Sequence, residues 1–239
     1  MPKASLFATC LVDQFKPEVG FAVLEVLKRL GVETDVPRGQ TCCGQPAFNS
    51  GFHEEARKVA QTALDAFEQS EAVVVPSGSC AAMVRHHYAE LFEDDPANRE
   101  RSRRMKVKTW EFSEYLTRVL GVEDVGASFG GSVTYHPSCH LQRDLGAGEG
   151  PPRLLKRVKG AEVRPLQRAD ECCGFGGAFS AKFPLLAGEM GRDKAEALKA
   201  TGADRVVACD AGCLLQMGSV LNGEGPKPCH LAELLAGRA

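Results

Sequence analysis

Two pairs of adjacent cysteines, each followed directly by a glycine, are the residues of this chain best suited to carry chemistry. They lie in the segments QTCCGQPAFNSG (40–51) and DECCGFGGAFSA (170–181). Each pair belongs to a set of four cysteines, and the single cysteine precedes its pair by 32 residues in one set and 33 in the other. We therefore interpret the sets as two copies of one site. The first is Cys10, Cys42, Cys43 and Cys80, and the second is Cys139, Cys172, Cys173 and Cys213.

Cysteine sets of this kind predict metal or redox chemistry rather than disulfides. We expect a cytoplasmic location, where disulfides are disfavoured, because the N-terminus has the pattern of a buried strand and not of a secretory signal. Structural zinc sites usually take thiolates spaced by two to four residues. Adjacent cysteines point to opposite sides of an extended chain, so they reach the separate irons of an iron–sulfur cluster more readily than one ion. The residues favour one cluster per set and leave open zinc or a metal-free dithiol.

Two glycines and two histidines beside the cysteines are candidates for cofactor binding. Gly44 and Gly174 follow the pairs, and glycine adopts the backbone dihedrals that a tight turn needs. Nearby backbone N–H groups can donate to cluster sulfurs. His136 and His140 flank Cys139, where they could hydrogen-bond a cluster; the alternative is that they only shape the loop.

The last two cysteines, Cys209 and Cys229, have no counterpart in the other half. We expect both to be structural, although Cys209 could approach the second site.

The similarity of the two halves extends beyond the cysteines. The segment AVVVPSGSCAAMV (72–84) resembles RVVACDAGCLLQM (205–217), and both read as a strand followed by a helix. Strand and helix patterns alternate in each half, which predicts parallel sheets with right-handed crossovers. We expect an α/β fold of two pseudo-symmetric repeats, each a small, mainly parallel three-layer sheet with helices on both faces. The predicted domains are 1–125 and 126–239, joined near 121–132, a Gly-rich segment short of core residues.

The expected elements place the cysteines just beyond strand ends. Ligands bind outside the carboxyl ends of the strands in open parallel sheets, so each set should converge on one rim. Strands are predicted near 4–9, 32–36, 71–76, 132–135, 161–165 and 204–208, and helices near 17–31, 52–69, 151–159, 181–201 and 211–221, with a further helix after Cys80.

Composition excludes several classes of function. The net charge of −2 gives no reason to expect a nucleic-acid partner, and we interpret the basic run 98–108 as a solvated linker before a strand. No run of about 20 apolar residues is present, so we expect no transmembrane segment. No flavin or nicotinamide fingerprint occurs, which indicates a chain that does not oxidise an organic substrate alone.

The order of one cysteine, then Cys-Cys-Gly, then a last cysteine resembles the CCG (cysteine-rich) domain. That domain occurs in heterodisulfide reductase and in the iron–sulfur subunits of glycolate oxidase and anaerobic glycerol-3-phosphate dehydrogenase. With two such domains, the chain resembles the lactate-utilisation protein A family over residues 3–238. The resemblance is carried by CCGQPAFNSG, PSGSC, YHPSCHLQRDLG and CCGFGGAFS.

This resemblance implies an iron–sulfur electron-transfer component of a complex that oxidises L-lactate to pyruvate. It implies one [4Fe–4S] cluster per domain, with the eight set cysteines as metal ligands. The partners would be the other subunits of that complex, including a ferredoxin-like iron–sulfur protein, because this chain has no C-x₂-C-x₂-C run. We expect a non-catalytic subunit of an oxidoreductase complex.

Two alternatives remain open at the level of sequence. One is a thiol–disulfide redox enzyme resembling heterodisulfide reductase, whose domains end in C-x-x-C; the endings PSGSC and CDAGC depart from that pattern. The other is a structural subunit stapled by zinc.

Overall fold

Buried β-branched residues form the centres of two parallel sheets in the computed structural model, which describes residues 1–239. The strand Val73–Val75 is buried along its whole length, as expected for a central strand with helices on both faces. The matching strand of the second half, Arg205–Ala208, is buried from its second residue onward. Strands alternate with helices throughout, so the connections lead from one parallel strand to the next.

The two sheets share one topology. Their strand orders are β2-β1-β3-β4 and β6-β5-β7-β8, and every neighbouring pair is parallel. This arrangement confirms the predicted α/β fold with two repeats. The strands are β1 (Lys3–Leu6), β2 (Glu33–Asp35), β3 (Val73–Val75), β4 (Thr109–Glu111), β5 (Ser128–Tyr135), β6 (Lys159–Arg164), β7 (Arg205–Ala208) and β8 (Lys227–His230).

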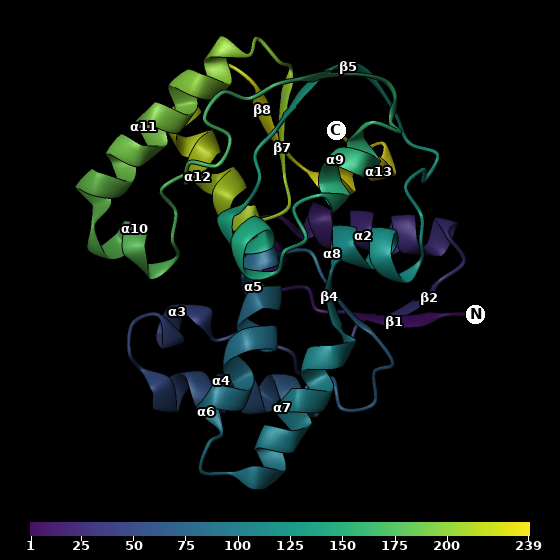
Figure 1. Ribbon diagram of the computed structural model, residues 1–239, viewed down its shortest axis with the longest axis vertical. Helices are drawn as coiled ribbons and strands as arrows, with labels where there is room; N and C mark the ends of the chain where they lie inside the picture. Colours follow the sequence, from purple (N-terminus) through teal and green to yellow (C-terminus); the bar gives the residue numbers. More distant parts are fainter.

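Helices flank both sheets, and the two halves lie one above the other (Figure 1). The first half contains α1 (Cys10–Phe15), α2 (Pro17–Arg29), α3 (Gln45–Phe48), α4 (His53–Ala66), α5 (Gly78–Ala82), α6 (Tyr88–Leu91), α7 (Pro96–Lys108), α8 (Phe112–Glu114) and the π-helical turns η1 (Met83–His87) and η2 (Tyr115–Val119). The second half contains η3 (His140–Asp144), also π-helical, and α9 (Gly150–Leu155), α10 (Ala178–Lys182), α11 (Pro184–Ala200), α12 (Ala211–Leu221) and α13 (Leu231–Ala236).

The solvated linker predicted for the basic run is wrong, because residues 98–108 lie within helix α7. The Arg101 guanidinium contacts the carboxylates of Asp65 (2.7 Å) and Glu68 (2.6 Å) on or after α4. Lys108 Nζ donates to the carbonyl oxygen of Phe67 at 2.8 Å. The basic side chains therefore tie α7 to the end of α4, and the strand expected after the run is β4.

Three further differences concern element boundaries. Edge strand β8 was not predicted, and the single helix expected over 181–201 is two helices. The break falls at Phe183, since the proline that follows disfavours helical backbone at the residue before it. The 121–132 segment was expected to be short of core residues, but Val125 and Ala127 are buried there and β5 begins at Ser128.

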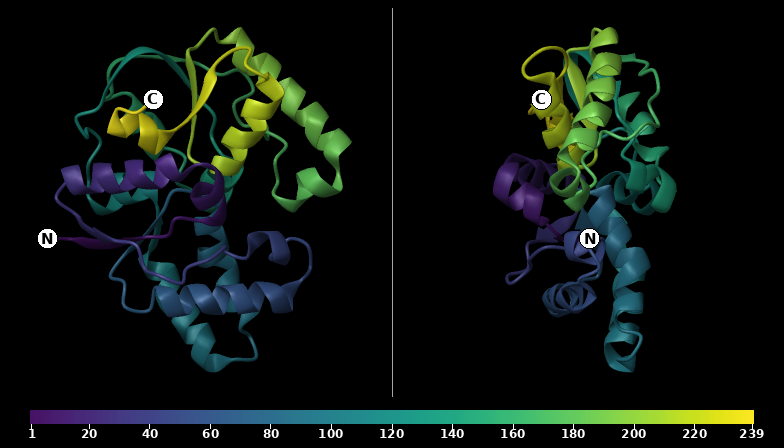
Figure 2. Two further views of the ribbon diagram at one scale, coloured as in Figure 1. Left: turned by 180° about the vertical axis from the view of Figure 1, so that it is seen from behind. Right: turned by 90° about the vertical axis from the view of Figure 1, so that its left-hand side faces the viewer.

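The two halves are joined by packing and by hydrogen bonds to backbone carbonyls. One continuous core cluster contains buried residues of both halves. Arg29, at the end of α2, donates through Nη1 to the carbonyl oxygens of Val125 (3.2 Å) and Leu235 (3.0 Å). The second of these lies in the last turn of α13, where helix carbonyls lack partners within the helix. Helices α2 and α13 accordingly lie side by side in the two views of Figure 2.

A pseudo-two-fold relation between the halves is visible at their closest approach. Ser77 and Asp210 occupy equivalent positions of the two repeats and form an isolated antiparallel bridge with each other. Each precedes the helix that carries the last cysteine of its set.

Glu111 is a buried carboxylic acid at the end of β4. Its Oε2 accepts hydrogen bonds from the backbone N–H groups of Ser113 (2.8 Å) and Glu114 (3.1 Å), so it caps α8. Its Oε1 has no hydrogen-bond partner. Burial raises the pKa of Glu111 to about 8, although the hydrogen bonds from the α8 turn act in the opposite direction.

This buried acid predicts a pH-dependent stability. Between about pH 4.5 and about pH 8 the folded chain holds a proton on Glu111 that the unfolded chain has released. The free energy of unfolding should therefore fall as the pH rises through this window, with a contribution from Glu111 of up to about 1.4 kcal/mol per pH unit. Glu111→Gln keeps an acceptor for the cap and should remove this contribution. Urea unfolding of both proteins across the window measures it, and equal slopes would contradict the assignment.

Candidate metal centres

The first quartet, which is Cys10, Cys42, Cys43 and Cys80, lies at the carboxyl ends of parallel strands. Cys10 begins α1 after β1, Cys42 and Cys43 occupy the loop between β2 and α3, and Cys80 lies in α5 after β3. The Sγ atoms of Cys10 and Cys42 are 3.6 Å apart. The Cys43 thiol interacts with the thiols of both Cys42 and Cys80. The structure thus brings all four thiols together, on the rim that parallel sheets offer to ligands.

The second quartet, which is Cys139, Cys172, Cys173 and Cys213, repeats this placement. Cys139 follows β5, the adjacent pair lies in the loop between β6 and α10, and Cys213 lies in α12 after β7. The thiols of Cys173 and Cys213 are within 4.8 Å of each other. The Cys139 thiol interacts with those of Cys172 and Cys213. Two groups of four thiols therefore exist, one at each sheet.

Within each pair the two cysteines take different positions. Cys43 and Cys173 are buried, whereas Cys42 and Cys172 are partly exposed. One sulfur of each pair thus lies in the interior and its neighbour lies toward the rim. The two sulfurs of a pair nevertheless stay in contact, since the Cys42 thiol interacts with that of Cys43 and the Cys172 thiol with that of Cys173.

The glycine after each pair turns the chain. Gly44 and Gly174 both have φ of 87°, a left-handed conformation that favours glycine. In that turn the N–H of Gly44 donates to Cys42 Sγ at 3.4 Å, and the N–H of Gly174 donates to Cys172 Sγ at 3.3 Å. The predicted role of the glycines in a special turn is therefore matched by the backbone of both halves.

The hydrogen bonds within a quartet favour negative charge on the first cysteine of each pair. The thiol of Cys10, followed by that of Cys43, lowers the pKa of Cys42 to about 3. The equivalent contacts, of which that from Cys139 is the largest, lower the pKa of Cys172 to about 2. The thiolate is the form of cysteine that binds metals. A set of four thiols in this arrangement is a donor set that fits a metal cluster.

Each half closes the site of the other. A cavity of about 300 Å³ beside the first quartet is also lined by second-half residues, namely Phe175, Gly177, Ala178, Asp210 and Ala211. A cavity of about 40 Å³ beside the second quartet is also lined by first-half residues, namely Gln45, Asn49 and Ser79. Asp210 Oδ2 crosses between the halves, where it accepts from Ser77 Oγ (3.1 Å) and from the Ser79 backbone N–H (3.0 Å).

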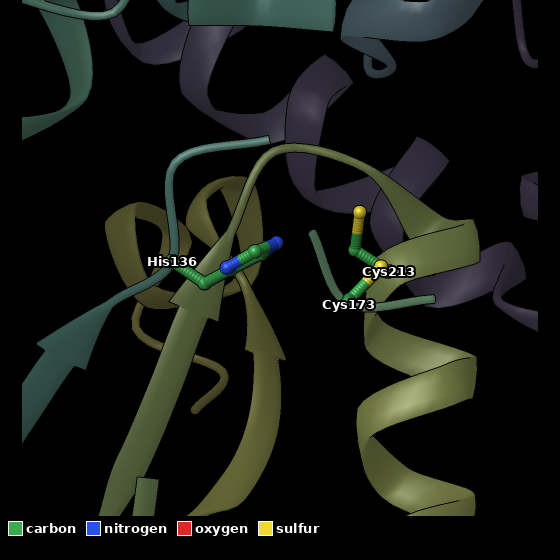
Figure 3. Close-up of side chains that lie close together, drawn as sticks. All are labelled: His136, Cys173 and Cys213. Carbon is green, nitrogen blue, oxygen red and sulfur yellow. The ribbon is translucent and has the colours of Figure 1, made fainter. Parts of the chain in front are cut away.

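The two candidate histidines take different places at the second quartet. His140 Nδ1 lies 3.5 Å from Cys139 Sγ, and its Nε2 lies 3.3 Å from Gln45 Nε2 of the first half. His136 is buried, and its ring points toward the thiols of Cys173 and Cys213 (Figure 3). The ligand atoms of these three residues lie within 4.8 Å of one another.

The last two cysteines are buried outside these groups. The Cys209 thiol interacts with Tyr135 and Glu111. Cys229 Sγ donates to the carbonyl oxygen of its neighbour His230 at 3.4 Å. Both thiols therefore have packing environments of their own.

Two residues that line both cavities were not predicted from the sequence. Gln45 and Phe175 directly follow the two Cys-Cys-Gly segments and line both cavities. Phe175 packs so closely on α12 that a Cβ at Gly212 would lie 2.4 Å from its ring. The sequence signal for these two residues was that each directly follows a Cys-Cys-Gly segment. That signal does not indicate that each residue contacts the other half.

Comparison with known proteins defines the class. The family model of the cysteine-rich domain, CCG, matches residues 4–85 and 133–218, so each half contains one copy. A membrane-crossing helix, which needs both length and apolarity, is absent from the chain.

Relatives that match over their full length identify the family within this class of cysteine-rich proteins. The chain is 46% identical to Lactate utilization protein A of Bacillus licheniformis over 239 residues, which is 99% of this chain and 100% of that protein. It is 46% identical to Lactate utilization protein A of Geobacillus thermodenitrificans over 98% of both chains. The chain belongs to the lactate utilization protein A family.

Solved structures add no argument about function. Glutamate racemase RacE1 from Bacillus anthracis aligns with 98% of this chain and 78% of its own, with a TM-score of 0.37 and 12% sequence identity.

The glycine turns predict a graded loss of stability on substitution by alanine. Gly51 has φ of 83° and open space around a Cβ, so Gly51→Ala should cost only the left-handed conformation, about 1 kcal/mol. At Gly44 a Cβ would also lie 3.3 Å from the Ala56 carbonyl oxygen, and at Gly174 one would lie 2.5 Å from that of Ala187. Gly174→Ala should therefore be the most destabilising of the three. Chemical unfolding measures the order, and equal losses would contradict the turn geometry.

Proposed function

We propose that each quartet holds one [4Fe–4S] cluster and that the chain is an electron-transfer component of a complex oxidising L-lactate to pyruvate. The observation that carries this proposal is the convergence of four thiols at the strand ends of each sheet, in a chain whose full-length relatives are named for lactate utilisation. On this proposal the eight quartet cysteines are metal ligands.

The adjacency of two cysteines in each quartet, with different burial, supports a cluster over a single ion. A tetrahedral zinc site needs all four sulfurs around one point at about 2.3 Å. Here the second cysteine of each pair is buried and the first lies toward the rim, which suits ligands of different irons. The Gly44 and Gly174 N–H groups already donate to sulfur, and such bonds help to set a cluster's reduction potential.

The residues of the chain would bind the two clusters, shield them from solvent and hold them near each other. Iron–sulfur clusters supply reversible one-electron oxidation and reduction. The quartet cysteines would hold them, and the cross-half lining of both cavities would limit the access of water. The direct contacts between Ser77, Ser79 and Asp210 keep the two sites adjacent, which shortens the path for an electron between them.

The partners follow from what the chain does not contain. It has neither a C-x₂-C-x₂-C run nor a dinucleotide-binding fingerprint. We propose that other subunits, including a ferredoxin-like iron–sulfur protein, contribute the substrate chemistry and the onward relay in the cytoplasm. In this complex the chain is a non-catalytic subunit.

Metal and sulfide content test the proposal. Protein purified without oxygen should be brown and contain about eight iron and about eight acid-labile sulfide per chain. Zinc in place of iron, or iron without sulfide, would overturn the cluster assignment.

Single substitutions should remove one cluster at a time. Cys42→Ser and Cys172→Ser should each lose about half of the iron and sulfide, because the two quartets are separate. Cys229→Ser is the matched control, since its thiol is buried outside both quartets, and it should keep the full content. A loss of iron in the control equal to that in Cys42→Ser would count against the ligand assignment.

A further inference from the structure

The two halves are built alike but differ at one buried position close to the cysteines in sequence. The residue after β1 is Phe7, and the residue after β5, the equivalent strand of the second half, is His136. Both side chains are buried, at 0% and 1% exposure. Phe7 packs against Phe67 with ring centroids 5.0 Å apart. The first half therefore has a packed phenylalanine at the position where the second half has an imidazole.

His136 is only partly satisfied by polar partners. Its Nδ1 is buried without any hydrogen bond, its imidazole interacts with the Cys213 thiol, and its backbone N–H donates to the Val207 carbonyl oxygen at 2.9 Å. A histidine that serves only the packing of a core normally has its polar atoms satisfied. The ring instead points toward Cys173 and Cys213, with its ligand atom within 4.8 Å of both sulfurs (Figure 3).

The same asymmetry recurs at the first cysteine of each set. His140, whose Nδ1 lies 3.5 Å from Cys139 Sγ, stands where the first repeat has Leu11. The glycine N–H donors, in contrast, are matched between the halves at 3.4 and 3.3 Å. The second site therefore has two imidazoles beside its sulfurs, and the equivalent positions of the first site are apolar.

We propose that His136 donates an N–H hydrogen bond to the sulfur of Cys213 in the loaded second centre and thereby makes it the centre of higher reduction potential. This inference rests on the proposed function, in which both quartets hold clusters. A donor to a ligand sulfur draws negative charge from it and so stabilises the reduced, more negative form. With both quartets loaded, transfer of one electron from the first centre to the second would be favoured, the first being oxidised and the second reduced with no bond made or broken. On this proposal His136 acts through the Cys213 sulfur as a hydrogen-bond donor and does not itself bind the metal.

Single-centre variants allow each potential to be assigned. Cys42→Ser should leave only the second centre and Cys172→Ser only the first, and a redox titration followed by electron paramagnetic resonance at one fixed pH measures each. The second centre should have the higher potential. In the Cys42→Ser background, His136→Phe, which copies the residue of the first half, should lower the potential of the remaining centre. His136→Gln, which keeps an N–H donor, should lower it less, and it serves as the test if the phenylalanine variant fails to bind iron.

Controls separate this inference from general damage and from the proposed function. His53→Phe, at an exposed histidine, should leave both potentials unchanged. An unchanged potential in His136→Phe at full iron content, or ¹⁴N hyperfine coupling strong enough to show that imidazole is bonded to iron, would overturn the inference alone. A wild-type chain without iron and labile sulfide would overturn the proposed function and this inference with it.

Discussion

The structure depends on the geometric constraint that two adjacent cysteines cannot direct both sulfurs to one side of an extended chain. The glycine after each pair resolves this constraint with the same left-handed φ of 87° in both halves. It turns the chain so that one sulfur is buried and its neighbour lies at the rim, where it accepts the glycine N–H. Strand ends then bring the other two thiols to the same place, because all strands of each sheet are parallel.

Because the fold is repeated within the chain, there are two such sites, and they lie next to each other. The halves meet at equivalent positions, Ser77 and Asp210, and the Asp210 carboxylate accepts hydrogen bonds from the first half. Neither half closes its own cavity, since Phe175 reaches the first site and Gln45 the second. The same contacts that line the cavities therefore hold the sites side by side. Differences between the repeats, such as Phe7 against His136, can then make two similar centres unequal without changing the fold.

Much of this arrangement could be predicted from the sequence, because local patterns determine it. The order of the cysteines indicated two sets, and apolar runs such as Val73–Val75 indicated buried parallel strands. Helix α7 escaped prediction because it buries only Ser102 and Met105, so no apolar periodicity marks it in the sequence. The break at Phe183 was missed although Pro184 marks it. Contacts across the halves, including that of Gln45 with His140, depend on three-dimensional packing that the order of residues does not encode locally.

Anomalous scattering at the iron absorption edge, from crystals grown without oxygen, tests the central claim most directly. The account predicts two separate iron peaks, one within the sulfurs of Cys10, Cys42, Cys43 and Cys80 and the other within those of Cys139, Cys172, Cys173 and Cys213. A single peak shared between the halves, or scattering at the zinc edge in place of the iron edge, would contradict it.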